Sequence, residues 1–279
     1  GKCVFLQLIN NPKFEIKAIN AVNLKINELE DYLIYDSSHK IKIENFEIIN
    51  DNEFKINNQK IKLLADRNPD KLKWRKYDCK YLIDATGAFL TQEKCLQHDI
   101  DYVIMSAPAK DNSSSFIYGA NHENYNRESI VSASSCTTNC LAPILKLIND
   151  NYLINNCNFT TIHAATASQY TVDVFKKSAR TNRSIFNNII PHTTGASSSI
   201  TKILPFLKNK IYGTSVRVPV LNCSLLDLNI EFNQEVNIDD IENLIEKSNL
   251  KNIVYKNINK KLVSSDFNTT TIPSNLDLN

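Results

Sequence analysis

The chain has 279 residues, 42% of them hydrophobic and 9% aromatic, which is enough for a sizeable core and two ordinary domains. Its net charge of +2 comes from scattered residues, so nothing favours a nucleic-acid or membrane partner, and no apolar run reaches the roughly 18 residues of a membrane span. Seven cysteines without paired or metal-type spacing exclude a disulfide framework, predict no metal site and favour a reducing compartment, for which we expect the cytoplasm.

The first half of the chain alternates helical and strand patterns. Apolar side chains at i, i+4 spacing predict a helix over 2–11, and alternation predicts a strand over 14–20. A third pattern predicts a strand that ends in the small-residue turn Thr86-Gly87, and a short helix and two strands follow over 91–99, 101–108 and 129–134. Short strands that alternate with helices predict βα units and a parallel sheet.

The second half begins with a predicted helix over 137–152 and then becomes rich in strands. Strand patterns cover 159–168, 211–220 and 223–232. A helix is predicted over 237–248, with Asn237 as its N-cap and an apolar face that includes Ile238 and Ile245. We therefore expect an antiparallel or mixed sheet flanked by helices, with one domain over 1–135 and a second over 136–279.

The stretch SASSCTTNCLAP, residues 132–143, places a cysteine among hydroxyl side chains where an apolar helix begins. Buried structural cysteines usually have apolar neighbours, whereas a reactive thiol needs donors that stabilise its thiolate. The N–H groups at a helix N-terminus favour the Cys136 thiolate, and they can also hold an oxyanion or a phosphate. Ser135 and Thr137 add hydroxyl donors. The pattern predicts covalent catalysis by Cys136, although a lone cysteine in such a setting is more often structural.

Other segments could complete such a site. His163 lies on the strand pattern TTIHAATAS, from which its imidazole could reach Cys136, lower the pKa of the thiol, and act as acid and base. A Thr194-Gly195 turn could bind phosphate through N–H and O–H groups, and Arg217 could hold a phosphate with two hydrogen bonds. Taken singly, a strand histidine is more often structural, and a strand arginine more often forms a surface ion pair.

In this order and spacing, these segments resemble phosphorylating glyceraldehyde-3-phosphate dehydrogenase. The matching stretches span nearly the whole chain: AIN, YDSSH, DATGAF, SAPAKD, NHENY, SASSCTTNCLAP, TTIHAATASQ, NNIIP, TTGAS, RVPV and LVSSDFN. The resemblance implies a homotetramer whose subunit has an α/β, Rossmann-type dinucleotide-binding domain followed by an α+β catalytic domain. It also implies the oxidation of glyceraldehyde 3-phosphate, with NAD and inorganic phosphate, through a thiohemiacetal and a thioester on Cys136, with His163 as acid and base.

The resemblance assigns roles to further residues. It implies a substrate-phosphate site at Thr166 and Arg217. It implies a site for the attacking phosphate at Ser135, Thr137, Thr194 and Gly195. It implies cofactor contacts at Gly1, Asn20, Arg67, Thr86, Gly87, Phe89 and Ser106.

The chain departs from the family at three places. The family has a glycine-rich loop before the position of Gly1 and a terminal helix after that of Asn279, so we expect a partial sequence. After IKAIN, the family usually has an Asp that binds the adenosine ribose hydroxyls, where this chain has Ala21. Loss of that carboxylate removes repulsion against a 2′-phosphate, so NADP is the alternative cofactor to NAD. In the loop near 174–190, Phe175 replaces the usual proline.

Three other interpretations stay open. One is an erythrose-4-phosphate dehydrogenase, which shares the Cys–His pair but releases an acid by hydrolysis. Another is a non-enzymatic binding protein descended from the dehydrogenase. The last is a cysteine hydrolase, which would need a third group to orient His163. The predicted phosphate site favours the phosphorylating dehydrogenase.

Overall fold

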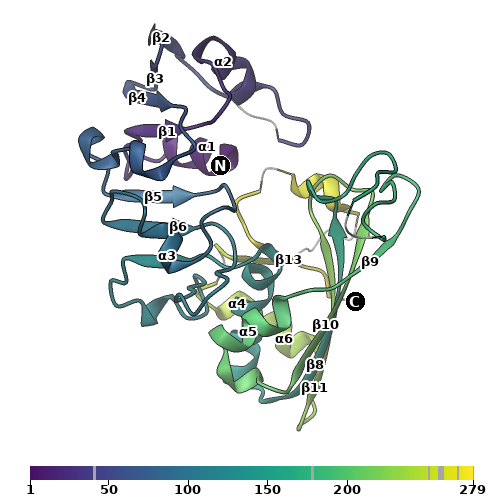
Figure 1. Ribbon diagram of the computed structural model, residues 1–279. Coiled ribbons are helices and arrows are strands. Elements are labelled where there is room, and N and C mark those ends of the chain that lie inside the picture. The colour runs from purple at the N-terminus through teal and green to yellow at the C-terminus, as the bar shows by residue number, and fades with distance from the viewer. Residues whose placement is uncertain (40–41, 177–178, 251, 257–260, 269, 279) are drawn as a thin grey trace. The chain divides into compact units, whose positions relative to one another are not determined.

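The computed structural model describes residues 1–39, 42–176, 179–250, 252–256, 261–268 and 270–278 (Figure 1). The chain forms two compact units, one of residues 1–115 and 126–133, the other of residues 116–125 and 134–279. Each unit has its own sheets and its own core. The assignment of a cofactor domain to 1–135 and a catalytic domain to 136–279 stays a prediction.

The first sheet of unit 1 combines one parallel pair with two hairpins. Its elements are α1 (Lys2–Ile9), β1 (Ala18–Asn20), α2 (Ile26–Ile34), β2 (Glu47–Asn50), β3 (Glu53–Ile56) and β4 (Gln59–Leu64), and the strand order is β1-β4-β3-β2 with β1 parallel to β4. Asn57 and Asn58 join β3 to β4 with φ values of 47° and 67°, the two left-handed positions that a tight hairpin needs. Phe5, Leu29 and Phe54 pack together in the core of this sheet.

The second sheet of unit 1 is entirely parallel. It contains β5 (Tyr81–Asp84), β6 (Tyr102–Met105) and β7 (Ile130–Ser132) in that order, and α3 (Gln92–Cys95) lies between β5 and β6 in the chain. Cys95, Val103, Met105 and Ile130 form its core. The parallel βα arrangement predicted for this half is confirmed.

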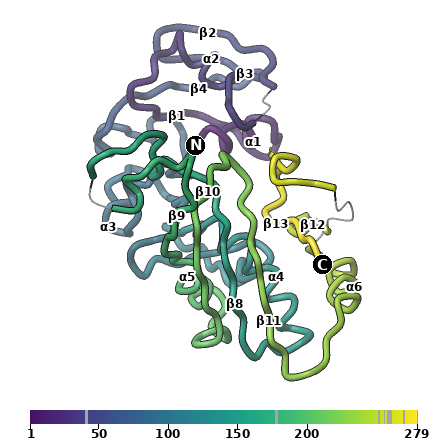
Figure 2. Tube along the Cα trace, turned by 90° about the vertical axis from the view of Figure 1, so that its right-hand side faces the viewer, coloured from purple at the N-terminus to yellow at the C-terminus, as the bar shows by residue number. Residues whose placement is uncertain are grey.

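Unit 2 is built on a mixed four-stranded sheet. Its elements are α4 (Cys136–Asn151), β8 (Ile154–Ala164), β9 (Ile190–His192), α5 (Ala196–Ile203), β10 (Ile211–Val218), β11 (Leu225–Phe232), α6 (Ile238–Lys247), β12 (Val254–Lys256) and β13 (Ser274–Leu276). The strand order is β11-β8-β10-β9, with β8 parallel to β10 and the other pairs antiparallel. Figure 1 shows α4, α5 and α6 on one face of this sheet, and Figure 2 looks onto the strands. Leu141, Leu145 and Ile200 fill the space beneath the helices with no exposed surface.

Some sequence-based expectations need correction. The strand predicted over 14–20 is present only at residues 18–20, because the Ile16 N–H donates to the Gln59 side chain (2.8 Å) instead of to a strand ladder. Ile238, predicted on the apolar face of α6, is 48% exposed at the first helical position, whereas Ile245 is buried. Asn237 is the N-cap, as predicted, and its N–H donates to Asp240 Oδ2 (3.1 Å).

The sequence analysis did not anticipate α2, β2, β3, β4, β9, α5, β12 and β13. Their patterns are short or weak, and most depend on partners elsewhere in the chain. Within the described ranges, no helix is both long and apolar enough to cross a membrane.

Candidate active site

Cys136 occupies the first position of α4 in unit 2. Ser134, which precedes the helix, is buried and has a left-handed φ of 59°, a conformation that costs energy for a residue with a side chain. Ser135 is the N-cap, and its Oγ accepts a hydrogen bond from the Thr138 N–H (3.1 Å). The position of Cys136 at the helix N-terminus is as the sequence predicted, and the residue is exposed.

His163 contacts the sulfur of Cys136 from the end of β8. Its Nε2 lies 3.4 Å from Cys136 Sγ. This contact is the main cause that lowers the pKa of the Cys136 thiol, and hydrogen bonds from Thr137 lower it further against the opposing effect of burial. The same contact raises the pKa of His163. Both shifts favour a thiolate–imidazolium pair over a neutral thiol and imidazole.

Arg217 lies on the far side of the His163 ring. The parallel register of β8 and β10 pairs the two residues directly, so their side chains leave the same face of the sheet. His163 Nδ1 is 2.7 Å from the Ala164 carbonyl oxygen and 2.7 Å from Arg217 Nη1, and Nη1 also donates to that carbonyl (3.0 Å). Arg217 Nε is buried and lacks an acceptor within the described part of the chain. A bound anion would supply that acceptor.

The remaining hydroxyl candidates of unit 2 lie in local turns. Thr166 follows β8, and its N–H and Oγ1 both donate to Gln169 Oε1, at 3.0 and 3.1 Å. Thr194 Oγ1 accepts from the Ala196 N–H (3.2 Å), and Gly195 is the N-cap of α5. The structure thus joins Cys136 to His163 and Thr137, and His163 to Arg217. The hydrogen bonds described for Thr166 and Thr194 are to residues two or three positions away.

Four of the predicted cofactor residues in unit 1 gather near the carboxyl end of β5. Thr86 and Gly87 form an exposed turn, in which Gly87 has a φ of 71°. Asp84 Oδ1 holds the turn by accepting from the Thr86 N–H (2.9 Å) and Oγ1 (2.6 Å). A Cβ placed on Gly1 would lie 3.6 Å from the Ala85 Cβ, so the start of α1 is next to this turn. Ser106 follows the neighbouring strand β6 and is exposed.

The other three cofactor candidates differ in their surroundings. Asn20 exchanges two hydrogen bonds with the backbone of Asp66, so it has a structural role at the ends of β1 and β4. Phe89 packs against the His98 ring, with 4.5 Å between the ring centres. Arg67 is exposed.

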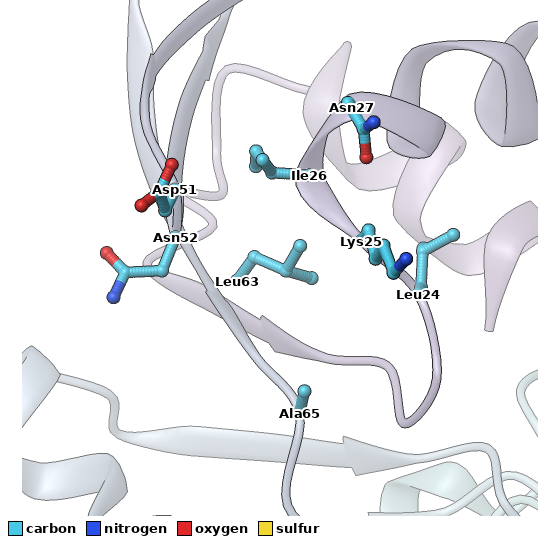
Figure 3. A pocket seen from close by; sticks show the side chains of 8 residues that line it. All are labelled: Leu24, Lys25, Ile26, Asn27, Asp51, Asn52, Leu63 and Ala65. Carbon is cyan, nitrogen blue, oxygen red and sulfur yellow. The ribbon is translucent and has the colours of Figure 1, made fainter.

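Two hollows open beside β1 in unit 1. The larger, of about 480 Å³, is lined by side chains from the start of α2 on one side and from the β2–β3 turn and β4 on the other (Figure 3). The smaller, of about 330 Å³, is lined by Ala21, Val22, Asn23, Leu24 and Tyr32. No carboxylate belongs to this smaller lining, so it offers no charge repulsion to a phosphate.

Comparison with known proteins identifies the family. Residues 1–92 match the family model described as glyceraldehyde 3-phosphate dehydrogenase, NAD binding domain, and residues 135–279 match the one described as glyceraldehyde 3-phosphate dehydrogenase, C-terminal domain. The chain belongs to the glyceraldehyde-3-phosphate dehydrogenase family. The resemblance stated from the sequence motifs is confirmed, as is the fold class of a dinucleotide-binding domain followed by a catalytic domain with a mixed sheet.

Curated members of the glyceraldehyde-3-phosphate dehydrogenase family align with most of the chain. The chain is 40% identical to glyceraldehyde-3-phosphate dehydrogenase of Bacteroides fragilis (strain YCH46) over 86% of this chain and 74% of the relative. It is 36% identical to glyceraldehyde-3-phosphate dehydrogenase 1 of Bacillus cereus over 99% of this chain and 84% of the relative. It is also 36% identical to the Atlantibacter hermannii enzyme over 98% of this chain and 95% of the relative.

Several residues of this family member escaped the sequence analysis. The sequence did not predict the left-handed backbone conformation of Ser134, because serine rarely adopts that conformation. Asp84 and Gln169 lie within the quoted stretches DATGAF and TTIHAATASQ, but the sequence analysis gave them no role, whereas the structure shows that their side chains hold Thr86 and Thr166. Among the described residues, no group of three or more His, Cys, Asp or Glu side chains is arranged to hold a metal ion.

Proposed function

We propose that this chain oxidises glyceraldehyde 3-phosphate with NAD and inorganic phosphate, through a thioester on Cys136. The contact between Cys136 Sγ and His163 Nε2 at the N-terminus of α4 carries this proposal, because it joins an exposed sulfur nucleophile, a proton carrier and the N-terminal end of a helix. Membership of the family supports the reaction and the cofactor.

The covalent step begins at the sulfur. The Cys136 thiolate attacks the aldehyde carbon, and the oxygen that becomes negative receives a hydrogen bond or a proton from His163 Nε2–H and hydrogen bonds from N–H groups of α4. The product is a thiohemiacetal on Cys136. His163 then accepts the hydroxyl proton as the carbon loses its hydride. NAD, when bound, supplies the hydride acceptor, and a thioester is left on the sulfur.

Release of the product needs a second anion. Inorganic phosphate attacks the thioester carbon, the carbon–sulfur bond breaks, and the Cys136 thiolate leaves, so 1,3-bisphosphoglycerate is formed. The unpartnered Arg217 Nε supports a phosphate beside His163. We assign Thr166 and Arg217 to the substrate phosphate, and Ser135, Thr137, Thr194 and Gly195 to the attacking phosphate.

The residues of unit 1 fit a dinucleotide. The start of α1 beside the Thr86-Gly87 turn offers backbone N–H groups to a pyrophosphate, and a Cβ on Gly87 would meet no atom within 4 Å. We assign Gly1, Asn20, Arg67, Thr86, Gly87, Phe89 and Ser106 to cofactor contacts. The smaller hollow beside Ala21, whose lining contains no carboxylate (the acid-free hollow), supports NADP as an alternative cofactor.

We further propose a homotetramer in the cytoplasm. The segment 172–189 exposes the large apolar side chains Val172, Phe175, Phe186 and Ile189, and burial between subunits would stabilise them. All seven cysteines are free, which suits a reducing compartment. Mass photometry of the purified protein tests the tetramer, and a monomeric mass would contradict it.

The function is tested by following reduced nicotinamide from glyceraldehyde 3-phosphate, with NAD and NADP in parallel, with and without inorganic phosphate. We expect phosphate-dependent turnover that Cys136→Ser abolishes. Turnover that persists in Cys136→Ser would refute the thioester, and turnover independent of phosphate would refute phosphorolysis. A folded protein that shows no turnover with either cofactor would refute the proposed activity.

A further inference from the structure

A second Cys–His contact lies far from Cys136 in the chain, within unit 1. Of the seven cysteines, only Cys3 and Cys136 are exposed, and the sulfur of each contacts the Nε2 atom of a histidine. Cys3 Sγ lies 3.8 Å from His39 Nε2. For the other five thiols, burial is the main cause that raises the pKa, in two of them to about 11.

The carboxylate of Asp36 orients the His39 ring. Asp36 Oδ1 is 3.0 Å from His39 Nδ1, and it also accepts from the backbone N–H groups of Ser38 (2.9 Å) and His39 (2.8 Å). These donors hold the pKa of Asp36 well below its usual range, so the carboxylate is ionised and can only accept. The proton of a neutral His39 therefore sits on Nδ1, and its Nε2 faces Cys3 as an acceptor.

Lys2 fixes this carboxylate from the other side. Its Nζ is 3.1 Å from Asp36 Oδ2, donates to the Tyr35 carbonyl oxygen (2.7 Å), and lies 5.2 Å from the centre of the Tyr32 ring. The Lys2 side chain is only 11% exposed and that of Asp36 19%, so the ion pair is sheltered from solvent. The result is a thiol, a base and an orienting carboxylate in series, on the start of α1 and the segment after α2.

We propose that Cys3 is a second reactive thiol of this protein, activated by His39 and Asp36, and that it forms mixed disulfides with low-molecular-weight disulfides. His39 Nε2 takes the S–H proton, and the Cys3 thiolate attacks one sulfur of the disulfide. A new bond forms to Cys3 Sγ, the disulfide bond breaks, and the leaving thiolate takes the proton from His39. The Cys3 sulfur is oxidised and the leaving sulfur is reduced, so no other oxidant is needed.

The position of Cys3 gives the modification a consequence that rests on the proposed function. Cys3 is the second residue of α1, two positions after the Gly1 N-cap that we assign to the cofactor. An adduct on its sulfur crowds the N–H groups offered to the pyrophosphate, so it lowers the affinity for NAD. The thiol therefore links the state of the disulfide pool to cofactor binding.

The reactivity is measured in the full chain carrying Cys136→Ser, which removes the other exposed thiol. The protein reacts with oxidised glutathione near pH 7, and mass spectrometry of the peptide that contains Cys3 gives the rate. We expect His39→Gln to slow the reaction about tenfold or more and Asp36→Asn to slow it severalfold, because base catalysis of proton transfer is lost or misaligned. Ser38→Ala is the matched control, since it keeps the backbone donors to Asp36, and its rate should equal the parent's.

The same variants are compared after unfolding in urea, which separates the pairing from the intrinsic reactivity of the cysteine. We expect the His39→Gln effect to vanish there. Equal rates for parent and His39→Gln in the folded state, with circular dichroism showing that both are folded, would overturn the proposal. So would a folded parent that reacts no faster than the unfolded chain.

Calorimetry of NAD binding, before and after modification in the Cys136→Ser chain, tests the consequence. We expect the affinity for NAD to fall about tenfold or more, because the adduct would interfere with the contacts of one part of the cofactor, the pyrophosphate. Unchanged affinity would refute the coupling. If the unmodified chain fails to bind NAD, the cofactor assignment fails, while the rates with glutathione still decide the reactivity of Cys3.

Discussion

Replacement of His163 by asparagine removes the ring nitrogen that contacts the Cys136 sulfur at 3.4 Å. Two effects of that contact are lost together. The sulfur loses the main cause that lowers its pKa, so the thiolate is less populated at neutral pH. In the proposed mechanism, the thiohemiacetal also loses the group that receives its proton.

The expected loss of rate in His163→Asn depends on the groups that still contact Cys136. Thr137 still donates to the sulfur, and the N-terminus of α4 is unchanged, so the nucleophile is weakened but not removed. Loss of a positioned acid–base group costs about 10²–10⁴-fold in rate. That loss corresponds to about 3–5 kcal/mol in activation free energy.

Two assays read these effects separately. Steady-state kinetics should give a kcat/KM about 10²–10⁴-fold below the parent's. The rate of alkylation by iodoacetamide, followed against pH, should rise at a higher pH than in the parent because the pKa of the Cys136 thiol is raised. His192→Asn is the matched control, since His192 Nδ1 contacts the Thr193 carbonyl (2.7 Å) as His163 Nδ1 contacts that of Ala164. A His163→Asn protein with the parent's kcat/KM and alkylation profile would refute the reasoning.

Four further substitutions test other parts of the structure. Ala21→Asp places a carboxylate in the acid-free hollow and should shift the ratio of kcat/KM values towards NAD by about tenfold, and an unchanged ratio would mean that discrimination lies elsewhere. Arg217→Leu should raise the KM for glyceraldehyde 3-phosphate by about tenfold or more, since a charge-assisted contact to phosphate is lost; parent-like kinetics would remove Arg217 from the phosphate site. Gly213→Ala should lower the free energy of unfolding in urea by about 1–3 kcal/mol, because its Cβ would lie 2.1 Å from the buried Phe159 ring; an unchanged midpoint would show that the ring can move. The pKa of Asp36 is lowered in the folded protein, so its ionised form stabilises the fold above the unfolded-state pKa of 3.8, and this contribution is lost as the pH falls towards the folded-state pKa. The Tm of Asp36→Asn should therefore decline less steeply with falling pH than that of the parent. Parallel declines of the two Tm values would contradict this linkage.

The sequence was sufficient to predict features that depend on residues close together in the chain. Ser135 caps α4 because its hydroxyl reaches the N–H three residues on, and such a cap is visible in the order of the residues. The position of Cys136 at the start of that helix follows from the same pattern. The motifs around Cys136 and His163 were also sufficient to indicate the family, which the comparisons confirm.

Short strands and turns could not be predicted in the same way. The β3–β4 hairpin depends on left-handed conformations of Asn57 and Asn58. Asparagine tolerates this conformation, but its presence in a sequence does not predict it. The strand at 14–20 was overestimated because Gln59, 43 residues away, takes the Ile16 N–H. The two cases have different causes: the hairpin is a local turn with a weak sequence signal, whereas the hydrogen-bond partner of Ile16 lies far away in the chain.

The sequence by itself indicated the family, the place of Cys136 at the start of a helix and the strand that carries His163, because each motif consists of residues a few positions apart. The tertiary structure alone decided which side chains meet. Arg217 reaches His163 through the β8–β10 register, across 54 residues of chain, and Cys3 reaches His39 across 36. Contacts at such separations are set by strand pairing and core packing, so no local pattern encodes them.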